Sequence, residues 1–351
     1  MALRSLDGQE AARSLTGFDA VIDARSPSEF AEDHLPGALN WPVLDDDQRR
    51  AVGTLYVQCS ALEARKVGAA MAARNIASHL EHWIADKPRD WQPLVYCWRG
   101  GQRSGALAWF LDQIGFRTTK LAGGYKGFRG VVRDALTSLP KQFDLRVVAG
   151  RTGSGKTRLL QALRAEGAQV LDLEGLACHR GSVLGGLPHQ PQPSQKAFDT
   201  QLWLALGQFD PQRPVFVESE SKKIGALQVP AALVDHMHAH GQVLRVDMPD
   251  PARVQLLLQE YGFFADDADR FCSLLDGLIA LRGRETVQRW QAMARAGQWA
   301  EVFGTMMLEH YDPLYNRSME RNYGSLDKAR TVTLADGSPD CLRAVVRSLI
   351  D

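Results

Sequence analysis

The sequence predicts an α/β protein with two parallel-sheet domains in tandem and a helical C-terminal part. Three observations predict it. Short apolar runs alternate with amphipathic stretches in the first half, the same alternation restarts after residues 139–142, and helical periodicity dominates from Pro251 onward. Strands separated by helices favour parallel sheets. Because 45% of the 351 residues are apolar, each half can bury a core of its own.

In the first half, three short apolar runs are typical of strands and two amphipathic stretches are typical of helices. The second helix stops before Pro140, which cannot continue it. The strands are expected at residues 18–23, 93–96 and 118–121, and the helices at 102–114 and 125–139. These elements form a predicted first domain over residues 1–139.

The second half, residues 140–351, begins with a strand, a glycine-rich loop and a helix. The expected strands are 144–149, 168–173, 214–218 and 242–247, and the expected helices are 156–165 and 195–208. Residues 175–193 are rich in Gly, Pro and His and show no period. A connection of this length without secondary structure is uncommon in a compact domain unless it has a function, so we expect a functional loop.

Composition excludes several classes of protein. Five cysteines, an odd number without any C-x-x-C spacing, argue against a disulfide framework or a zinc site. Charged residues interrupt the first fifteen positions, which excludes a signal peptide, and no uninterrupted apolar run is long enough to span a bilayer. We therefore expect a soluble cytoplasmic protein without a membrane partner. A net charge of zero neither requires nor excludes a nucleic-acid partner.

The glycine-rich loop at residues 150–157 matches the G-x-x-x-x-G-K-T pattern in full, between a strand and a helix. That context predicts a P-loop, in which backbone N–H groups wrap phosphate oxygens and Lys156 reaches the outer phosphate. The Thr157 hydroxyl is the candidate Mg²⁺ ligand, and no tightly bound cofactor is expected. No N/T-K-x-D motif follows, which disfavours a GTPase. The predicted phosphate-binding residues are Gly150, Thr152, Gly153, Ser154, Gly155, Lys156 and Thr157.

Acidic residues end two of the predicted strands of the second domain. Glu218 closes one and is followed by Glu220, and Asp172 and Glu174 close another. The carboxyl ends of parallel strands meet at one sheet edge, so Asp172, Glu218 and Glu220 are candidates to act as acids or to orient a metal. The alternative interpretation is helix capping or a solvated loop.

Cys97 lies between a strand and a glycine-containing turn that opens a helix. Arg99 and Arg103 follow it, and both their charge and the helix dipole would lower the pKa of the thiol. Cys97, Arg99, Arg103 and Lys156 are therefore the predicted catalytic residues. The alternative for Cys97 is an inert thiol buried at a strand end.

The first half resembles rhodanese domains. The resemblance rests on D-A-R-S-P-S-E-F at residues 23–30, H-L-P-G-A-L-N at 34–40 and L-A-G-G-Y at 121–125, and places Cys97 at the persulfide-forming position. It implies a rhodanese-like fold over the first domain. The spacing from Cys97 to Arg103 also fits the C-x5-R loop of rhodanese-fold phosphatases, and spacing alone does not separate the two.

A rhodanese-like half joined to a P-loop half resembles the bacterial tRNA 2-selenouridine synthase family. Further matches are H-R-G-S at residues 179–182, P-S-Q at 193–195, E-S-E-S at 218–221 and Y-D-P-L-Y at 311–315. The resemblance implies replacement of the sulfur of wobble 2-thiouridine by selenium. It also implies that S-geranylation from geranyl diphosphate precedes selenation from selenophosphate, with Cys97 handling selenium.

The implied partners are the anticodon loop of tRNA, geranyl diphosphate, and selenophosphate that its synthetase could channel to the protein. DNA is not expected. A tRNA needs a basic surface, and the expected contributors are Arg99, Arg103, Arg117, Lys120, Lys126, Arg129, Arg133, Arg282, Arg284, Arg289 and Arg295. Two other functions stay open at this point. One is an ATP-dependent tRNA sulfurtransferase that carries a Cys97 persulfide, and the other is a nucleotide-sensing regulatory module.

Overall fold

The computed structural model describes residues 3–323 and 329–350. The chain divides into two compact units. The first comprises Met1–Ala135 together with Ser194–Thr200, and the second comprises Leu136–Pro193 together with Gln201–Asp351. The short segment Ser194–Thr200 thus belongs by its contacts to the first unit, although it lies in the second half of the sequence.

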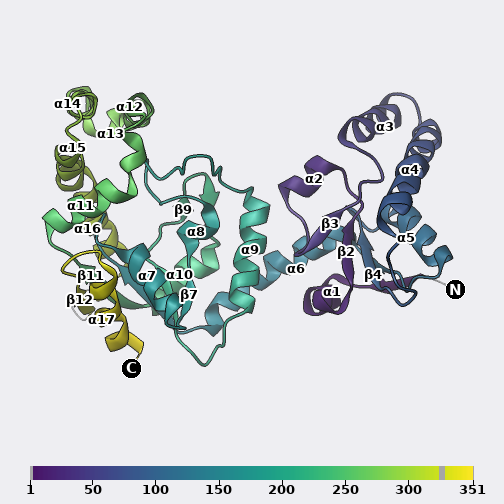
Figure 1. Ribbon diagram of the computed structural model, residues 1–351, viewed down its shortest axis with the longest axis horizontal. Helices are drawn as coiled ribbons and strands as arrows, with labels where there is room; N and C mark the ends of the chain where they lie inside the picture. The colour runs from purple at the N-terminus through teal and green to yellow at the C-terminus, as the bar shows by residue number, and fades with distance from the viewer. Residues whose placement is uncertain (1–2, 324–328, 351) are drawn as a thin grey trace. The chain divides into compact units, whose positions relative to one another are not determined.

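The first unit is built on a parallel sheet of five strands in the order β1-β5-β4-β2-β3, of which β2, β3 and β4 are labelled in Figure 1. The central strand β4 is buried at all four of its positions, as expected of a parallel sheet covered on both faces. The strands are β1 (Arg4–Leu6), β2 (Ala20–Asp23), β3 (Ala38–Asn40), β4 (Pro93–Tyr96) and β5 (Thr119–Leu121).

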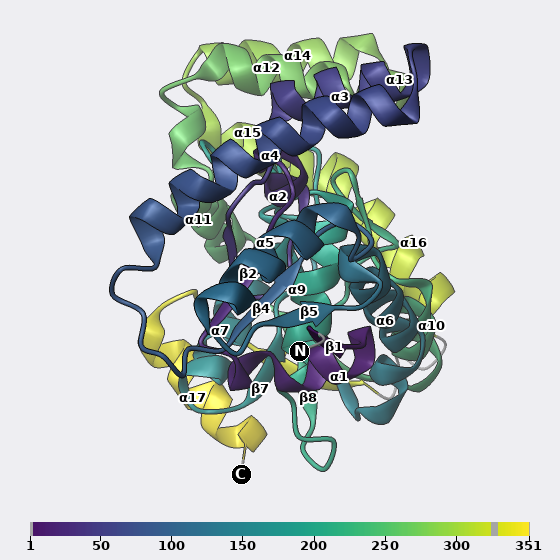
Figure 2. The same cartoon turned by 90° about the vertical axis from the view of Figure 1, so that its right-hand side faces the viewer.

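Six helices surround this sheet, and sequence signals start several of them. Ser26 and Glu29 form a capping box at α2, and Asp45 and Gln48 form another at α3. The antiparallel helices α3 and α4 pack against each other (Figure 2). The helices are α1 (Gly8–Ser14), α2 (Pro27–Glu32), α3 (Asp46–Gln58), α4 (Ala61–Trp83), α5 (Gln102–Ile114) and α6 (Gly124–Ser138).

The second unit contains another parallel sheet of five strands, in the order β12-β11-β6-β8-β7. A two-stranded antiparallel hairpin, β9 and β10, stands apart from it. The strands are β6 (Leu145–Ala149), β7 (Gln169–Leu171), β8 (Val215–Glu218), β9 (Lys223–Ile224), β10 (Leu227–Gln228), β11 (Gln242–Asp247) and β12 (Arg330–Thr333).

The helices of the second half fall into two groups, and α9 begins within the segment that clusters with the first unit. Those close to the sheet are α7 (Lys156–Ala165), α8 (Leu173–Ala177), α9 (Gln195–Gly207), α10 (Ala231–His240) and α17 (Pro339–Ile350). Those of the C-terminal helical part are α11 (Asp250–Glu260), α12 (Ala268–Asp276), α13 (Ile279–Arg282), α14 (Arg284–Arg295), α15 (Trp299–Met306) and α16 (Asp312–Asn322), with a π-helical turn at Met307–Tyr311.

The C-terminal helices have an apolar core of their own. Phe264, Phe271 and Trp290 are completely buried in it, and α12, α13 and α14 lie together over it (Figure 1). The five-stranded sheet of the second unit has a separate core. It packs against α7 and α17 around Leu159, Leu163 and other apolar side chains.

The expected α/β class with two parallel sheets and a helical C-terminal part is confirmed. Several expected bounds were wrong by one or two residues, as for the strand expected at residues 18–23, which begins at Ala20. The strand expected at residues 168–173 ends at Leu171, because the Asp172 side chain caps a short helix that begins at Leu173. Within the described residues, no helix is both long and apolar enough to cross a membrane.

Candidate active site

The glycine-rich loop follows β6, the middle strand of the second sheet, and leads directly into α7. Gly155 adopts a φ of +81° immediately before the helix, a conformation that other residues rarely tolerate. The Lys156 ammonium donates a hydrogen bond to the Gly150 carbonyl at 2.7 Å, across the loop. The loop therefore has the strand–turn–helix setting that presents backbone N–H groups and a cation to phosphate.

Carboxylates from the two neighbouring strands meet at this edge. Glu218 is the last residue of β8 and accepts a hydrogen bond from the Leu173 N–H at 3.0 Å. Glu174 lies in the first turn of α8, and its Oε2 is 3.3 Å from the Thr157 hydroxyl. Asp172 accepts from the Gly175 N–H at 2.7 Å, so this carboxylate caps α8. The structure thus joins the glycine loop to the predicted acids and adds Glu174 to them.

Burial changes the ionisation of this cluster. Burial and the charge of the hydrogen-bonded Glu220 carboxylate together raise the pKa of Glu174 to about 8. Burial also raises the pKa of Glu220 and lifts the pKa of Glu218 well above its ordinary value. It lowers the pKa of Lys156, against the opposing effect of the Glu174 and Glu220 charges. The charges of Lys156, Glu174 and Glu220 therefore influence one another's ionisation.

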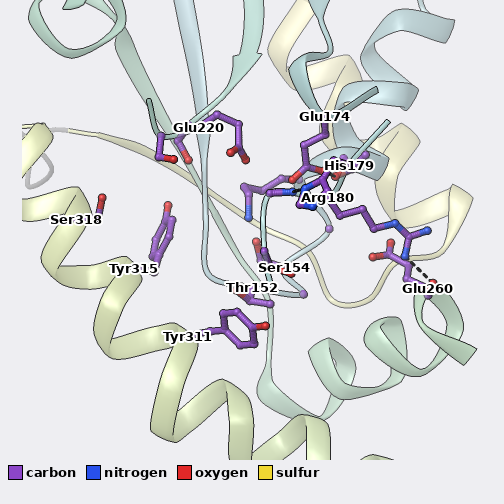
Figure 3. A pocket seen from close by; sticks show the side chains of 18 of the residues that line it. Thr152, Ser154, Glu174, His179, Arg180, Glu220, Glu260, Tyr311, Tyr315 and Ser318 are labelled. Carbon is purple, nitrogen blue, oxygen red and sulfur yellow. Dashed lines mark hydrogen bonds between the residues drawn. The ribbon is translucent and has the colours of Figure 1, made fainter. Parts of the chain in front are cut away.

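A cavity of about 810 Å³ opens over the loop. In Figure 3, Thr152 and Ser154 of the glycine loop lie between two groups of side chains. His179, Arg180 and Glu260 are on one side, and Glu220, Tyr315 and Ser318 are on the other. Residues of the long segment 175–193, among them Arg180 and Ser182, line this cavity, and so does one face of α16. The arrangement can hold a phosphorylated ligand together with a sizeable organic group.

A buried ion pair ties α16 to the glycine loop. The Arg253 side chain is completely buried, and its guanidinium donates to both Asp312 oxygens, at 2.6 and 2.9 Å. The same guanidinium donates to the Thr152 carbonyl at 2.9 Å through Nε. Tyr315, one turn beyond Asp312, accepts a hydrogen bond from the Gly150 N–H. The Y-D-P-L-Y motif at residues 311–315 therefore lies against the backbone of the glycine-rich loop.

The oxygen donors fit the Mg²⁺ ion that the glycine-loop motif implies. Mg²⁺ prefers oxygen ligands and usually takes one or two protein groups besides substrate phosphates and water. The Thr157 hydroxyl faces Glu174, and the buried Glu218 Oε1 has no hydrogen-bond partner among the described residues. No set of three or more His, Cys, Asp or Glu side chains within residues 3–323 and 329–350 is arranged as a metal site. Thr157 as a Mg²⁺ ligand therefore stays a prediction.

The second site belongs to the first unit. Cys97 follows β4, is 3% exposed, and its sulfur accepts a hydrogen bond from the Ser104 hydroxyl at 3.1 Å. The loop closes against the start of α6, where the Tyr125 N–H donates to the Cys97 carbonyl at 2.8 Å. A Cβ at Gly124 would come within 2.2 Å of that carbonyl oxygen, so only glycine fits there. The Cys97 sulfur therefore lies in a closed loop between β4 and α5, with a hydroxyl donor beside it.

The two arginines of this loop differ. Arg99 is exposed and makes no hydrogen bond or ion pair within the described ranges. Arg103 pairs with Glu29 at 2.6 Å, and Glu29 also meets Arg49 at 3.0 Å. These cations lower the pKa of Glu29, although its burial acts in the opposite direction. The positive charge expected beside the thiol from Arg103 is therefore shared with a carboxylate.

Two family models match this chain in succession. The rhodanese-like domain matches residues 7–130, and the tRNA 2-selenouridine synthase AAA domain matches residues 143–277. A protein of Hydrogenovibrio crunogenus named tRNA 2-selenouridine synthase is 32% identical over 88% of this chain and 91% of its own length. A protein of the same name from Chromohalobacter salexigens is 33% identical, over 86% of this chain and 88% of its own.

The chain belongs to the tRNA 2-selenouridine synthase family. A relative of that name from Nitrosomonas europaea is 36% identical over 69% of this chain. The aligned part spans 63% of that protein's length, and 66% of the relative from Nitrosomonas eutropha. The two matched domains correspond to the two sites described above, the cysteine loop in one and the glycine loop in the other.

In this member of the tRNA 2-selenouridine synthase family, several expected surface cations are already engaged. Arg129 is 9% exposed and pairs with Asp199 at 2.8 Å. Arg282 donates to the ring and carbonyl of His310, and Arg289 pairs with Glu309. These three arginines are therefore poorer candidates for phosphate contacts than the sequence indicated. Among the cations expected to contact tRNA, those that are exposed and unpaired within the described residues are Arg99, Arg117, Lys126, Arg133 and Arg284.

Sequence reasoning missed Arg253, Asp312 and Tyr315 as parts of the phosphate site. Arg253 lies on an amphipathic helix and has no local signal that marks it as buried. Asp312 and Tyr315 belong to Y-D-P-L-Y, whose proline at the start of a helix was the one visible signal. Their contacts span more than fifty residues of sequence, so only the folded chain brings them together.

Proposed function

We propose that this protein is a transferase that converts the 2-thiouridine of a tRNA to 2-selenouridine. Membership of the family and its two-domain arrangement support the proposal. The observation that carries it is the second-unit cavity, in which a complete phosphate loop faces a wall of aromatic and hydroxyl side chains. A cavity of about 810 Å³ accepts a diphosphate that bears a substantial organic group.

The first step proposed is S-geranylation of the thiouracil by geranyl diphosphate. The sulfur forms a bond to the carbon of the donor, the bond from that carbon to the diphosphate oxygen breaks, and the base loses its ring N–H proton. Lys156 and the loop N–H groups stabilise the negative charge on the departing diphosphate. When bound, Mg²⁺ would add positive charge at the same oxygens, held through Thr157.

The second step proposed is the exchange of the alkylated sulfur for selenium from selenophosphate. Alkylation turns the sulfur into a thioether, so selenium that adds to the ring carbon expels it as geranyl thiol. The selenium–phosphorus bond of selenophosphate breaks, and its phosphoryl group passes to water as phosphate. Cys97, with its hydroxyl donor Ser104, is proposed to handle the incoming selenium. Substitution of Cys97 by serine should abolish selenation and spare S-geranylation, and the matched Cys59→Ser variant at an exposed cysteine should change neither.

Ligand binding separates this proposal from its alternatives. Calorimetry of the full chain with geranyl diphosphate, ATP and GTP in turn should show tight binding of geranyl diphosphate and no nucleotide turnover. ATP turnover stimulated by tRNA would instead favour the ATP-dependent sulfurtransferase. Nucleotide binding without turnover, with a Cys97 thiol that does not react with alkylating agents, would favour a regulatory module.

A further inference from the structure

One face of α16 continues the phosphate site outward. Tyr315 lies at the glycine loop, where its hydroxyl accepts from the Gly150 N–H and its ring centroid is 5.7 Å from the Lys156 Nζ. Met319 and Tyr323 follow at four-residue intervals and line the same cavity. At a helical rise of 1.5 Å per residue, Met319 lies about 6 Å along the helix axis from Tyr315. Tyr323 is the C-cap of α16.

The position of the Tyr315 ring is fixed from both sides. Its hydroxyl is held by the loop backbone, and the start of its helix is held by the Arg253–Asp312 pair. Burial raises the pKa of Tyr315 to about 12, so the phenol stays neutral near pH 7. The ring already attracts one cation, the Lys156 ammonium. When Lys156 pairs with a diphosphate, the same ring lies beside the carbon that the diphosphate leaves.

The remaining residues of this face are suited to contact a hydrocarbon group. Met319 and Tyr323 are each 5% exposed, and Leu314 lines the cavity between Tyr315 and the start of the helix. A thioether and aromatic rings suit a flexible unsaturated chain, to which they present polarisable surface. Ser318 and Asn322 lie beside them on α16 and supply polar groups at the margin.

We propose that this α16 face, formed by Tyr315, Met319 and Tyr323, holds the hydrocarbon group of an allylic diphosphate, and that Tyr315 stabilises its developing positive charge. The inference rests on the function proposed above. As the carbon–oxygen bond lengthens, its electron pair leaves with the diphosphate and the allylic carbon becomes electron-poor. The face of the Tyr315 ring attracts that charge until the thiouracil sulfur supplies a new electron pair and the base releases its proton to solvent.

The first test removes the ring and then restores it. Single-turnover geranyl transfer to a 2-thiouridine tRNA is measured for the wild type, Tyr315→Leu and Tyr315→Phe, with pyrophosphate affinity measured in parallel by calorimetry. Loss of a cation–π contact predicts a rate about 3- to 30-fold lower for Tyr315→Leu. We expect Tyr315→Phe to recover most of that loss, and pyrophosphate affinity to stay within about twofold in both variants.

The second test asks whether the α16 face limits the length of the hydrocarbon chain that the site accepts. Met319→Ala should raise the rate with farnesyl diphosphate relative to geranyl diphosphate by about tenfold or more, because it lengthens the apolar site. Met293→Ala, in the C-terminal helical core away from the cavity, should leave that ratio unchanged.

Three results would overturn the inference. One is equal transfer rates for Tyr315→Leu and Tyr315→Phe, and another is an unchanged chain-length ratio in Met319→Ala. The third is a loss of pyrophosphate affinity in Tyr315→Leu that matches its loss of rate, which would make Tyr315 a support of the loop only. If the wild type itself transferred no geranyl group, the proposed function would fall and this inference with it.

Discussion

Arg253 shows at the scale of one residue how the phosphate loop is held. Its buried guanidinium joins the Thr152 carbonyl to the carboxylate of Asp312. Such a pair stabilises little by itself, because desolvation offsets the attraction, but removing one partner leaves a buried charge uncompensated. The loop therefore depends on a residue more than fifty positions away in the sequence.

Substitution of Asp312 by asparagine tests this dependence. We expect the free energy of unfolding to fall by about 3–5 kcal/mol, because the half-exposed Asp250 would be the one carboxylate left beside the buried Arg253 within the described residues. Chemical denaturation of the wild type and the variant measures the difference. Asp340→Asn, at an exposed pair with Arg343, is the control and should cost less than about 1 kcal/mol. Equal losses in the two variants would contradict the account.

The raised pKa of Glu174 predicts that the free energy of unfolding depends on pH. Its pKa is raised from 4.5 to about 8 in the folded state, so the native protein holds a proton that the unfolded chain releases. This contribution to stability is complete below pH 4.5 and is lost as the pH rises through about 8. Between these limits, one such group changes the free energy of unfolding by up to about 1.4 kcal/mol per pH unit.

Glu174→Gln should therefore lose less stability than the wild type between pH 6.5 and pH 8.5. Denaturation at several pH values in that range measures the two slopes. Glu63→Gln, at an exposed ion pair on α4, provides the matched control and should keep the wild-type slope. A Glu174→Gln slope as steep as that of the wild type would show that this carboxyl does not hold the proton.

At the scale of elements, the cysteine loop and the start of α6 form one surface. The Lys126 N–H donates to the Trp98 carbonyl at 2.9 Å, so the exposed side chains of Arg99 and Lys126 flank the loop that bears Cys97. Neither cation has an ion-pair partner within the described residues. They are therefore suited to contact the phosphates of the tRNA loop that the proposed function requires as substrate.

Replacing Arg99 and Lys126 together with alanine should weaken tRNA binding and reduce its dependence on salt. For a single-stranded loop, each lost phosphate contact reduces the slope of log K against log salt concentration by about 0.7. Titrations of labelled tRNA at several KCl concentrations give the slope. Arg289→Ala, whose side chain already pairs with Glu309, should leave it nearly unchanged, and a double variant with the wild-type slope would exclude this surface.

Another element, the first turns of α9, completes the first unit. Asp33 is 4% exposed and accepts hydrogen bonds from the Tyr125 hydroxyl at 2.7 Å and the Thr200 hydroxyl at 2.9 Å. Arg129 donates to the Thr200 hydroxyl at 3.1 Å. A segment from the second half of the sequence therefore satisfies a buried carboxylate of the first unit.

Thr200→Val should destabilise the first unit by about 1–3 kcal/mol, because it removes a hydrogen bond from the buried Asp33 and another from Arg129. Unfolding followed by hydrogen exchange of amides in β2 and β4 reports on that unit. Thr54→Val, on the exposed face of α3, should change stability by no more than about 0.5 kcal/mol. Equal effects of the two substitutions would contradict the role assigned to Thr200.

For the elements, local pattern was a good guide wherever periodicity and turn chemistry agreed. The strand at Pro93–Tyr96 and the helices at Gln102–Ile114 and Lys156–Ala165 have the expected bounds. Capping decided the bound at Asp172, where a polar side chain started a helix inside an expected strand. The attachment of Ser194–Thr200 to the first unit had no sequence signal, since it depends on contacts with Asp33 and Arg129.

At the scale of the whole molecule, each unit carries one reactive loop at the end of a buried parallel strand. Cys97 follows β4 of the first sheet, and the glycine loop follows β6 of the second. Both loops were visible in the sequence, because their motifs are local and their glycines are required by geometry. The aromatic face of α16 and the Arg253 bridge were not, because buried long-range contacts leave no local pattern. The proposed function assigns S-geranylation to the second unit and selenation to the first.

That assignment is tested most directly by giving two variants two tRNA substrates. Lys156→Ala and Cys97→Ser are incubated with geranyl diphosphate and selenophosphate, and the tRNA nucleosides are then analysed by mass spectrometry. On 2-thiouridine tRNA, Lys156→Ala should form no S-geranyl product, yet it should still form 2-selenouridine when supplied with S-geranyl tRNA. Cys97→Ser should accumulate the S-geranyl nucleoside. If Lys156→Ala fails on both substrates, or if Cys97→Ser makes 2-selenouridine at the wild-type rate, the division of steps between the two loops is wrong.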